Sequence, residues 1–294
     1  MGEMVGAVAT LSRFPVKSMQ GERLATAELT ESGVAGDRAY ALVETDTGKV
    51  LSAKNPSLGT QLLRCRAAFV EAAGSGDETP AVRITLPDGT AVASDARDAD
   101  ATLSDFLGRE VTLQRAAPVD FTIDQYHPDV EDLDPEGHRD TVTESKLGAA
   151  FFAQAGIPSP VAAGSFLDLF PVSVLTTSTL AQLDALRPES RFDDRRFRMN
   201  VVVDTSEEGF VENGWTGRSL QIGDSVRLTV FLPDPRCVMT TLAQDDLPKD
   251  NDILRTLARH NRIEVAGGLY PCAGVYAVVE AAGNIRAGDQ VSLV

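Results

Sequence analysis

The sequence predicts a mainly β protein with α-helical insertions (α+β), made of an N-terminal β-barrel-like module and a C-terminal β-barrel. Three observations predict this class: many short apolar or alternating runs, turn-forming Gly and Asp residues between them, and few segments with helical periodicity. The length of 294 residues and the 43% hydrophobic content suffice for two cores. The expected divisions are a module at 1–117, an acidic loop or linker at 118–143, and a second domain at 144–294.

The first module is expected to be almost entirely β. Turn signals such as Asp46-Thr47-Gly48 separate its apolar runs. Only 98–107 has the pattern of a short helix, and it is followed by Gly108, a common residue at helix C-termini. Strands are predicted at 5–11, 25–29, 39–43, 49–52, 62–69, 82–86, 91–93 and 111–114.

The segment from Pro118 to Thr143 is acidic, contains proline and has no clear period, so it is expected to be a long surface loop or linker. Its Asp132, Asp134 and Glu136 have the spacing of the first half of a calcium-binding loop. The twelfth position of such a loop needs a glutamate and is Thr143 here. Calcium binding is therefore disfavoured.

The second domain is expected to alternate strands with two helices. The first helix is predicted at 177–187, where Ser and Thr residues can cap its start and Pro188 follows its end. The second is predicted at 251–259. Strands are predicted at 173–175, 197–203, 220–222, 225–231, 274–280 and 291–294, with turns at Gly223-Asp224 and Gly283-Asn284.

The charge of the chain excludes some partners. A formal net charge of −16 and a pI of about 4.6 disfavour binding to nucleic acids or anionic lipids. No apolar run reaches the roughly 18 residues of a membrane span, and residues 1–11 lack the features of a signal peptide. We therefore expect no membrane span and a cytoplasmic location.

Cysteine usage limits the kinds of metal site. Cys65, Cys237 and Cys272 are far apart and form no CxxC pair, so a disulfide framework is not expected. Structural zinc sites and iron-sulfur clusters usually need about four Cys or His ligands at short spacing, and the three histidines do not supply them. We expect Cys65 and Cys272 to be packed as small hydrophobic residues.

Cys237 is the most distinctive chemical group. It follows Arg236 in the run 233–241, just after a predicted strand, where a neighbouring cation favours the thiolate. The alternative is a buried structural cysteine. The predicted strand 197–203 would place Arg198 and Asn200 on one face, where they could bind an anion and the edge of a heterocycle.

Further cationic and hydroxyl groups follow other predicted strands. Lys17 and Ser18 come just after the first strand, and Arg38 precedes another. Each could contact a phosphate. Lys17, Arg38 and Arg198 could equally balance carboxylates in a chain that is this acidic.

Together these segments resemble the MOSC superfamily, whose members include proteins of the amidoxime-reducing type. The resemblance covers essentially the whole chain. An N-terminal MOSC β-barrel module is indicated by the motifs at 14–18, 36–38 and 52–56, and a C-terminal MOSC β-barrel by those at 197–203, 215–224, 236–241 and 274–276.

The resemblance implies a molybdenum cofactor, a molybdopterin whose metal takes one protein thiolate. Cys237 would be the metal ligand. Pro235 and Met199 depart from residues common in relatives of the amidoxime-reducing type, and Pro235 supplies neither a hydroxyl nor a backbone N–H. The residues implied to hold phosphate and pterin are Lys17, Ser18, Arg38, Arg198 and Asn200, with Arg236 and Tyr276 lining the pocket.

The resemblance also implies an activity: a molybdenum-dependent oxidoreductase that removes oxygen from N-hydroxylated or N-oxide-type substrates. The chain has no nicotinamide motif, so electrons would come from a separate ferredoxin or flavoprotein reductase. One alternative is a molybdenum cofactor carrier or sulfur-transfer protein that uses a Cys237 persulfide. A second is a β-rich binding module without a metal.

Overall fold

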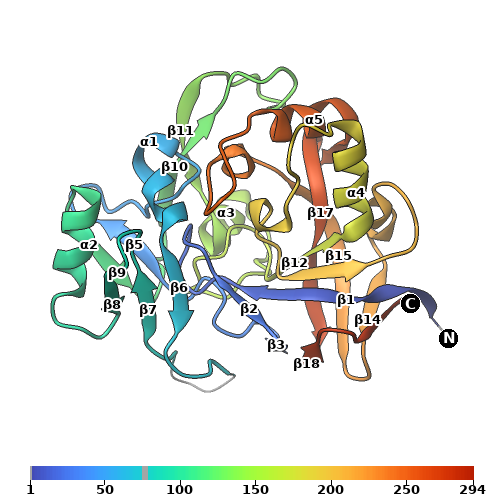
Figure 1. Ribbon diagram of the computed structural model, residues 1–294, viewed down its shortest axis with the longest axis horizontal. Helices are drawn as coiled ribbons and strands as arrows, with labels where there is room; N and C mark the ends of the chain where they lie inside the picture. The colour runs from blue at the N-terminus through green and yellow to red at the C-terminus, as the bar shows by residue number, and fades with distance from the viewer. Residues whose placement is uncertain (1, 75–78) are drawn as a thin grey trace.

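A computed structural model describes residues 2–74 and 79–294 and contains a closed seven-stranded barrel, on the right in Figure 1. The pairing of β12 with β17 closes the barrel. In order around it, the strands are β12 (Val172–Thr176), β13 (Val201–Asp204), β1 (Glu3–Arg13), β19 (Gln290–Leu293), β14 (Ser219–Ile222), β15 (Val226–Pro235) and β17 (Gly268–Ala281). Strand β1 at the N-terminus thus completes a barrel whose other strands come from the second half of the chain.

Alternation of apolar residues explains how these strands form a barrel. In β15 the side chains of Val226, Leu228 and Val230 are buried, whereas those of Arg227 and Phe231 are exposed. The buried set packs with Val, Leu and Ile side chains of the other barrel strands into one core. Three shorter strands lie outside the closed ring. β2 (Glu22–Leu24) pairs with β1, β16 (Arg262–Val265) pairs with β17, and β18 (Gly283–Arg286) pairs with a strand of the N-terminal module.

The N-terminal module lies beside the barrel, on the left in Figure 1. It has its own core, which includes Val16, Tyr40, Leu62, Ile84 and Leu103. Its elements are β3 (Thr26–Thr30), β4 (Gly33–Val34), β5 (Ala41–Glu44), α1 (Pro56–Gly59), β6 (Arg66–Phe69), β7 (Val82–Thr85), β8 (Ala91–Ala93), α2 (Ala99–Leu107) and β9 (Val111–Gln114). β3 and β4 form a sheet with β18, so this module and the barrel share a sheet.

A hairpin and three helices complete the fold. β10 (Thr122–His127) pairs with β11 (Thr141–Lys146) in a hairpin at the top of Figure 1, and α3 (Gly148–Ala155) follows it. Helices α4 (Thr177–Leu186) and α5 (Asp252–His260) cover one side of the barrel, where Leu183, Ile253 and Leu257 pack against Val202.

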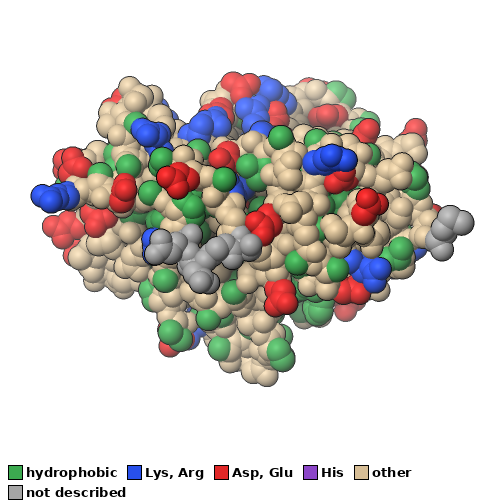
Figure 2. All heavy atoms as spheres, turned by 90° about the horizontal axis from the view of Figure 1, so that it is seen from below, with side chains coloured by type: hydrophobic (Ala, Val, Ile, Leu, Met, Phe, Trp, Pro, Cys, Tyr) green, Lys and Arg blue, Asp and Glu red, His purple; other side chains and the backbone are tan. Residues whose placement is uncertain are grey.

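The predicted fold class, mainly β with helical insertions and two barrel-type modules, is confirmed. Most predicted strands and all three predicted helices are present, and Gly108 ends α2 in the left-handed conformation at φ 66°. No helix among residues 2–74 and 79–294 is long and apolar enough to cross a membrane. On the face in Figure 2, acidic and basic side chains are interspersed.

Several predicted elements need correction. Residues 118–143 are not wholly loop, because Thr122–His127 forms β10 through pairing with a strand that follows. The strand predicted at 62–69 is a 3-10 turn, Thr60–Arg64, followed by β6. At 49–52 only Val50 bridges to Val43, and Gly283-Asn284 begins β18 instead of forming a turn.

Candidate functional site

All eight sequence-predicted site residues line one cleft of about 920 Å³. Its walls come from the N-terminal module, the β10–β11 hairpin, α3, the barrel and the loop after β15. The cleft brings together Lys17, Ser18, Arg38, Arg198, Asn200, Arg236, Cys237 and Tyr276. Cys65 and Cys272 are fully buried and do not line the cleft, which confirms their expected role as packed side chains.

Cys237 lines the cleft and comes directly after β15. This strand continues to Pro235, beyond its predicted end at Phe231. The carbonyl oxygen of Cys237 accepts hydrogen bonds from the backbone N–H (3.2 Å) and hydroxyl (3.1 Å) of Thr240. The backbone is therefore fixed by the 3-10 turn Val238–Thr241, while the half-buried thiol faces the cleft.

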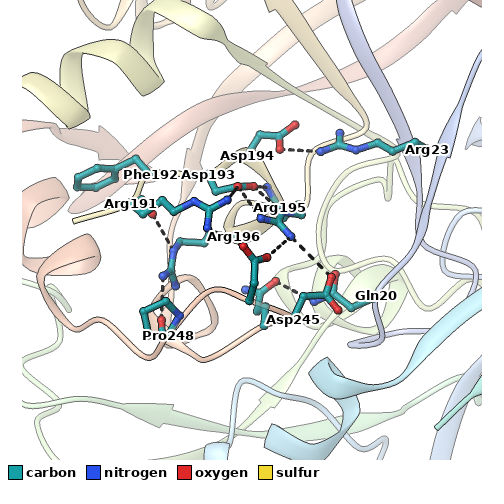
Figure 3. Close-up of polar contacts among 12 residues, drawn as sticks. Gln20, Arg23, Arg191, Phe192, Asp193, Asp194, Arg195, Arg196, Asp245 and Pro248 are labelled. Carbon is teal, nitrogen blue, oxygen red and sulfur yellow. Dashed lines mark hydrogen bonds and ion pairs between the residues drawn. The ribbon is translucent and has the colours of Figure 1, made fainter. Parts of the chain in front are cut away.

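Arg196 connects two chain segments that both line the cleft. Its guanidinium is fully buried and donates to the carbonyls of Arg191 (2.9 Å) and Pro248 (2.8 Å), as Figure 3 shows. It also donates to the carbonyls of Thr240 (3.2 Å) and Leu242 (3.3 Å), just after Cys237. This one side chain thus holds the turn before Arg198 against the loop that contains Cys237.

The predicted strand at 197–203 is wrong in its first half. Arg198 has a left-handed backbone (φ 56°), and β13 begins only at Val201. Arg198 and Asn200 therefore do not share a strand face, although both line the cleft. The buried Arg196 fixes the preceding turn, and the backbone of Asn200 pairs with Ser173 and Ser12.

Two guanidinium groups stack on the ring of Phe14. The Cζ atoms of Arg38 and Arg198 lie 4.6 and 4.3 Å from its centroid. Arg38 pairs with Asp37 and donates to the carbonyl of Arg198 (3.1 Å), whose own guanidinium donates to the carbonyl of Met19 (2.7 Å). Burial, together with the charge of Arg38, lowers the pKa of Arg198 to about 9. An anion in the cleft would relieve this crowding of positive charge.

Lys17 and Lys54 share the carboxylate of Asp168. Lys17 is buried, donates to the carbonyl of Phe166 (2.8 Å) and pairs with Asp168, which Lys54 contacts at 2.9 Å. Burial lowers the pKa of Lys17. Burial would lower the pKa of Lys54 as well, but the nearby Asp168 and Cys237 raise this pKa overall. Burial would raise the pKa of Asp168, yet the two lysines lower it well below its usual range.

We expect Asp168→Ala to lower the free energy of unfolding at pH 7 by about 2–3 kcal/mol, because it leaves two lysines unpaired. The side chain of Asp168 is 31% exposed, so the loss should be smaller than for a fully buried pair. Its folded pKa lies below the unfolded value of about 4, so the contribution is present above pH 4 and lost as the pH falls below it.

Urea unfolding of both proteins from pH 7 to pH 3 measures this difference. Asp124→Asn is the control, because Asp124 pairs with Lys49 at the surface and should cost no more than about 1 kcal/mol. A difference between wild type and Asp168→Ala that does not change with pH would contradict the assignment.

Ser18 and Asn200 are largely engaged within the protein. The Ser18 hydroxyl oxygen accepts from the backbone N–H of Ala53 (3.0 Å). The Asn200 amide accepts from the backbone N–H and hydroxyl of Ser173 (both 3.1 Å) and donates to Asp37 (2.9 Å). The hydroxyl hydrogen of Ser18 is still available to a ligand, whereas Asn200 mainly fixes neighbouring segments.

Arg236, Asp234 and Tyr276 form a buried polar group beside Cys237. Arg236 pairs with Asp234 and donates to the carbonyl of Phe197 (2.6 Å). Burial raises the pKa of Asp234 to about 6, against the opposing effect of Arg236. Among the described residues, Asp234 Oδ1 and Arg236 Nε are buried and have no hydrogen-bond partner, so this group has unused hydrogen-bonding capacity.

Sequence reasoning did not single out Lys54, Asp168 or Asp234 as site residues. Lys54 lies in the motif 52–56, and Asp234 is three residues before Cys237, so both positions carried a signal. Asp168 had no such signal, because only folding brings it to the two lysines. Part of the cleft lining is apolar: Phe170 stacks on Tyr276 with ring centroids 5.3 Å apart, and Leu167, Leu169 and Phe151 also line the cleft.

Comparison with known proteins gives matches over most of the chain. The model of the MOSC N-terminal beta barrel domain matches residues 5–120, and that of the MOSC domain matches residues 163–292. Mitochondrial amidoxime-reducing component 1 of Homo sapiens is 24% identical over 308 residues, covering 99% of this chain and 84% of the human protein. Mitochondrial amidoxime reducing component 2 of Rattus norvegicus is 24% identical over 298 residues, covering 98% of this chain and 83% of the rat protein. The YUAD protein from Bacillus subtilis is similar over 100% of this chain and 98% of its own, with TM-score 0.45 and 11% identity.

Proposed function

This chain belongs to the MOSC family, and we propose that it is a molybdenum-cofactor-binding oxidoreductase that removes oxygen from N-hydroxylated or N-oxide-type substrates. Its family supports a role associated with the molybdenum cofactor, and relatives named amidoxime-reducing components support the type of substrate. One observation carries the proposal: a half-buried thiol and an excess of positively charged side chains line the same cleft.

The charges around the predicted site residues fit an anionic cofactor. Arg196 also lines the cleft, but its guanidinium donates to backbone carbonyls of the protein. Apart from Arg196, five cationic side chains accompany three carboxylates, so an excess of two positive charges is left when all are ionised. The cations are Lys17, Lys54, Arg38, Arg198 and Arg236, and the carboxylates are Asp37, Asp168 and Asp234. Such an excess in a chain of net charge −16 favours a phosphate-bearing ligand over another role for these residues.

The residues fit a molybdopterin in the following way. Lys17, Arg38 and Arg198 would hold the phosphate, with the hydroxyl of Ser18 as an added donor. Arg236 Nε and Asp234 Oδ1, which have no hydrogen-bond partner among the described residues, would hydrogen bond polar atoms of the pterin. Asn200 would keep Asp37 and Ser173 in place. Cys237 would ligate the metal, since thiolates are soft donors.

Once bound, molybdenum would supply the change of oxidation state that oxygen removal needs. The protein would orient the substrate and exclude water. Phe170 and Tyr276, with Leu169, would form an apolar wall near Cys237 for the substrate's carbon skeleton. Electrons would come from a separate ferredoxin or flavoprotein reductase.

Metal analysis and an activity assay test the proposal together. The protein is purified from a host that makes the cofactor, and reduction of benzamidoxime with an artificial reductant is measured. We expect molybdenum in near-equal amount to protein and substrate-dependent turnover. Stoichiometric molybdenum without turnover would favour a carrier or sulfur-transfer protein. Absence of molybdenum would favour a binding module without a metal.

A further inference from the structure

Two of the three histidines in the chain converge on one carboxylate in the lining of the cleft. His138 Nδ1 lies 2.6 Å and His127 Nδ1 3.6 Å from Asp134 Oδ2. The side chains are 35%, 12% and 10% exposed for His138, His127 and Asp134, so the group is partly protected from water. All three ligand atoms lie within 4.8 Å of one another.

The fold explains why spacing in the sequence did not predict this group. β10 ends at His127, and the chain then returns through a turn in which Gly137 has a left-handed backbone (φ 78°) and donates to the carbonyl of Asp134 (2.9 Å). The backbone N–H of His138 donates to Asp134 Oδ2 at 3.1 Å. The hairpin thus brings together ligands that are eleven residues apart.

The carboxylate is held firmly in place. Leu133, on one side of Asp134, is buried against Leu254 and Ala258 of α5. Pro135, on the other side, packs so closely on Gly268 that a Cβ there would lie 2.7 Å from its ring. A ligand held between two packed neighbours loses little freedom when it binds.

The orientation of His127 is the one that metal ligands use. Its Nε2 lies 2.9 Å from the hydroxyl oxygen of Thr143, so that ring nitrogen can donate while Nδ1 offers its lone pair toward Asp134. Metal-bound imidazoles regularly donate their other N–H to such a partner, which fixes the tautomer. The ring of His138 lies beside that of His127, with centroids 4.9 Å apart.

We propose that His127, Asp134 and His138 bind a divalent transition-metal ion of the Zn²⁺ class, separate from any metal at Cys237. Two imidazoles and one carboxylate are a donor set that suits Zn²⁺ and leaves a coordination position for water or for Glu136, whose Oε2 is 3.6 Å from His138 Nδ1. The ion would hold in one conformation the segment between β10 and β11, which lines the cleft. The acidic segment 118–143 would attract it.

Zinc titration of the full-length protein, after removal of metals with EDTA, tests this site. Calorimetry should show one site whose affinity falls by at least about tenfold in His127→Gln and in His138→Gln. His260→Gln is the matched control, because His260 is exposed at the end of α5. The zinc affinity of His260→Gln should equal that of the wild type. The affinity of Cys237→Ala, which lacks the thiol as a competing ligand, should also be unchanged.

Two further readouts separate a built site from loose binding to acids. Co²⁺ should give the absorption of a four-coordinate ion without a thiolate charge-transfer band, and Zn²⁺ should raise the Tm of the wild type but not of His127→Gln. Asp129→Asn combined with Glu131→Gln should leave the affinity unchanged. Equal affinity of the wild type, His127→Gln and His138→Gln, or no zinc binding at all, would overturn the proposal. Neither result depends on molybdenum or turnover, so it leaves the proposed function untouched.

Discussion

Replacing Cys237 by alanine is expected to lower amidoxime turnover by more than about a hundredfold, because it removes the proposed protein ligand to the metal. The cations proposed to hold the phosphate remain, so some cofactor should still bind. The stability of the protein should change little, since the thiol is only half-buried and packs in no core. Turnover, molybdenum content and thermal unfolding of the variant measure the three effects separately.

Cys65→Ala is the matched control for this substitution. Cys65 is fully buried in the core of the N-terminal module, so its loss should cost about 1 kcal/mol of stability and leave turnover unchanged. Full turnover in Cys237→Ala would show that Cys237 is not the ligand. Equal loss of turnover in both variants would indicate a folding defect.

Arg196→Ala is expected to lower the free energy of unfolding by about 4 kcal/mol. The substitution leaves the carbonyls of Arg191, Thr240, Leu242 and Pro248 without their donor and opens a cavity where the side chain is fully buried. Arg196→Met should cost less, because it fills part of the cavity and still leaves the carbonyls unpaired. Chemical denaturation of both variants measures these differences.

The neighbouring Arg195 supplies the control. It pairs with Asp193 and Asp246 at the surface, where an ion pair contributes at most about 1 kcal/mol. Arg195→Ala should therefore be close to wild type. Similar losses in Arg195→Ala and Arg196→Ala would mean that Arg196 does not hold the two segments together.

Local signals predicted the regular elements well. The cap and end residues of α2 and α4 were readable, because Gly108 adopts the left-handed conformation and Thr176 accepts a hydrogen bond from Thr179. Strand β15 was predicted from its alternation, apart from its last four residues, where the two prolines give no clear signal.

Elements that depend on distant partners were less predictable. β10 is polar and lies in an acidic segment, so only its pairing with β11 makes it a strand. Arg198 is surrounded by apolar residues typical of a strand, yet the bonds of the buried Arg196 impose a turn before it. The position of β1 in the barrel depends on pairing with β13 and β19 far along the chain.

The sequence predicted which residues form the candidate site better than it predicted their geometry. All eight residues named from the sequence line the cleft, and all eight lie within the motifs that carried the family resemblance. Their roles differ in detail: the Asn200 amide is used within the protein, and Asp168 enters as the partner of Lys17. Side-chain pairing of this kind follows from tertiary contacts that no local pattern encodes.

X-ray absorption at the molybdenum edge tests the central claim most directly. The claim is that the thiolate of Cys237 is bound to molybdenum in the cleft. The wild-type protein should show one sulfur ligand more than Cys237→Ala, with the rest of the coordination shell unchanged. Identical sulfur coordination in the two proteins, or molybdenum absent from the wild type, would contradict it.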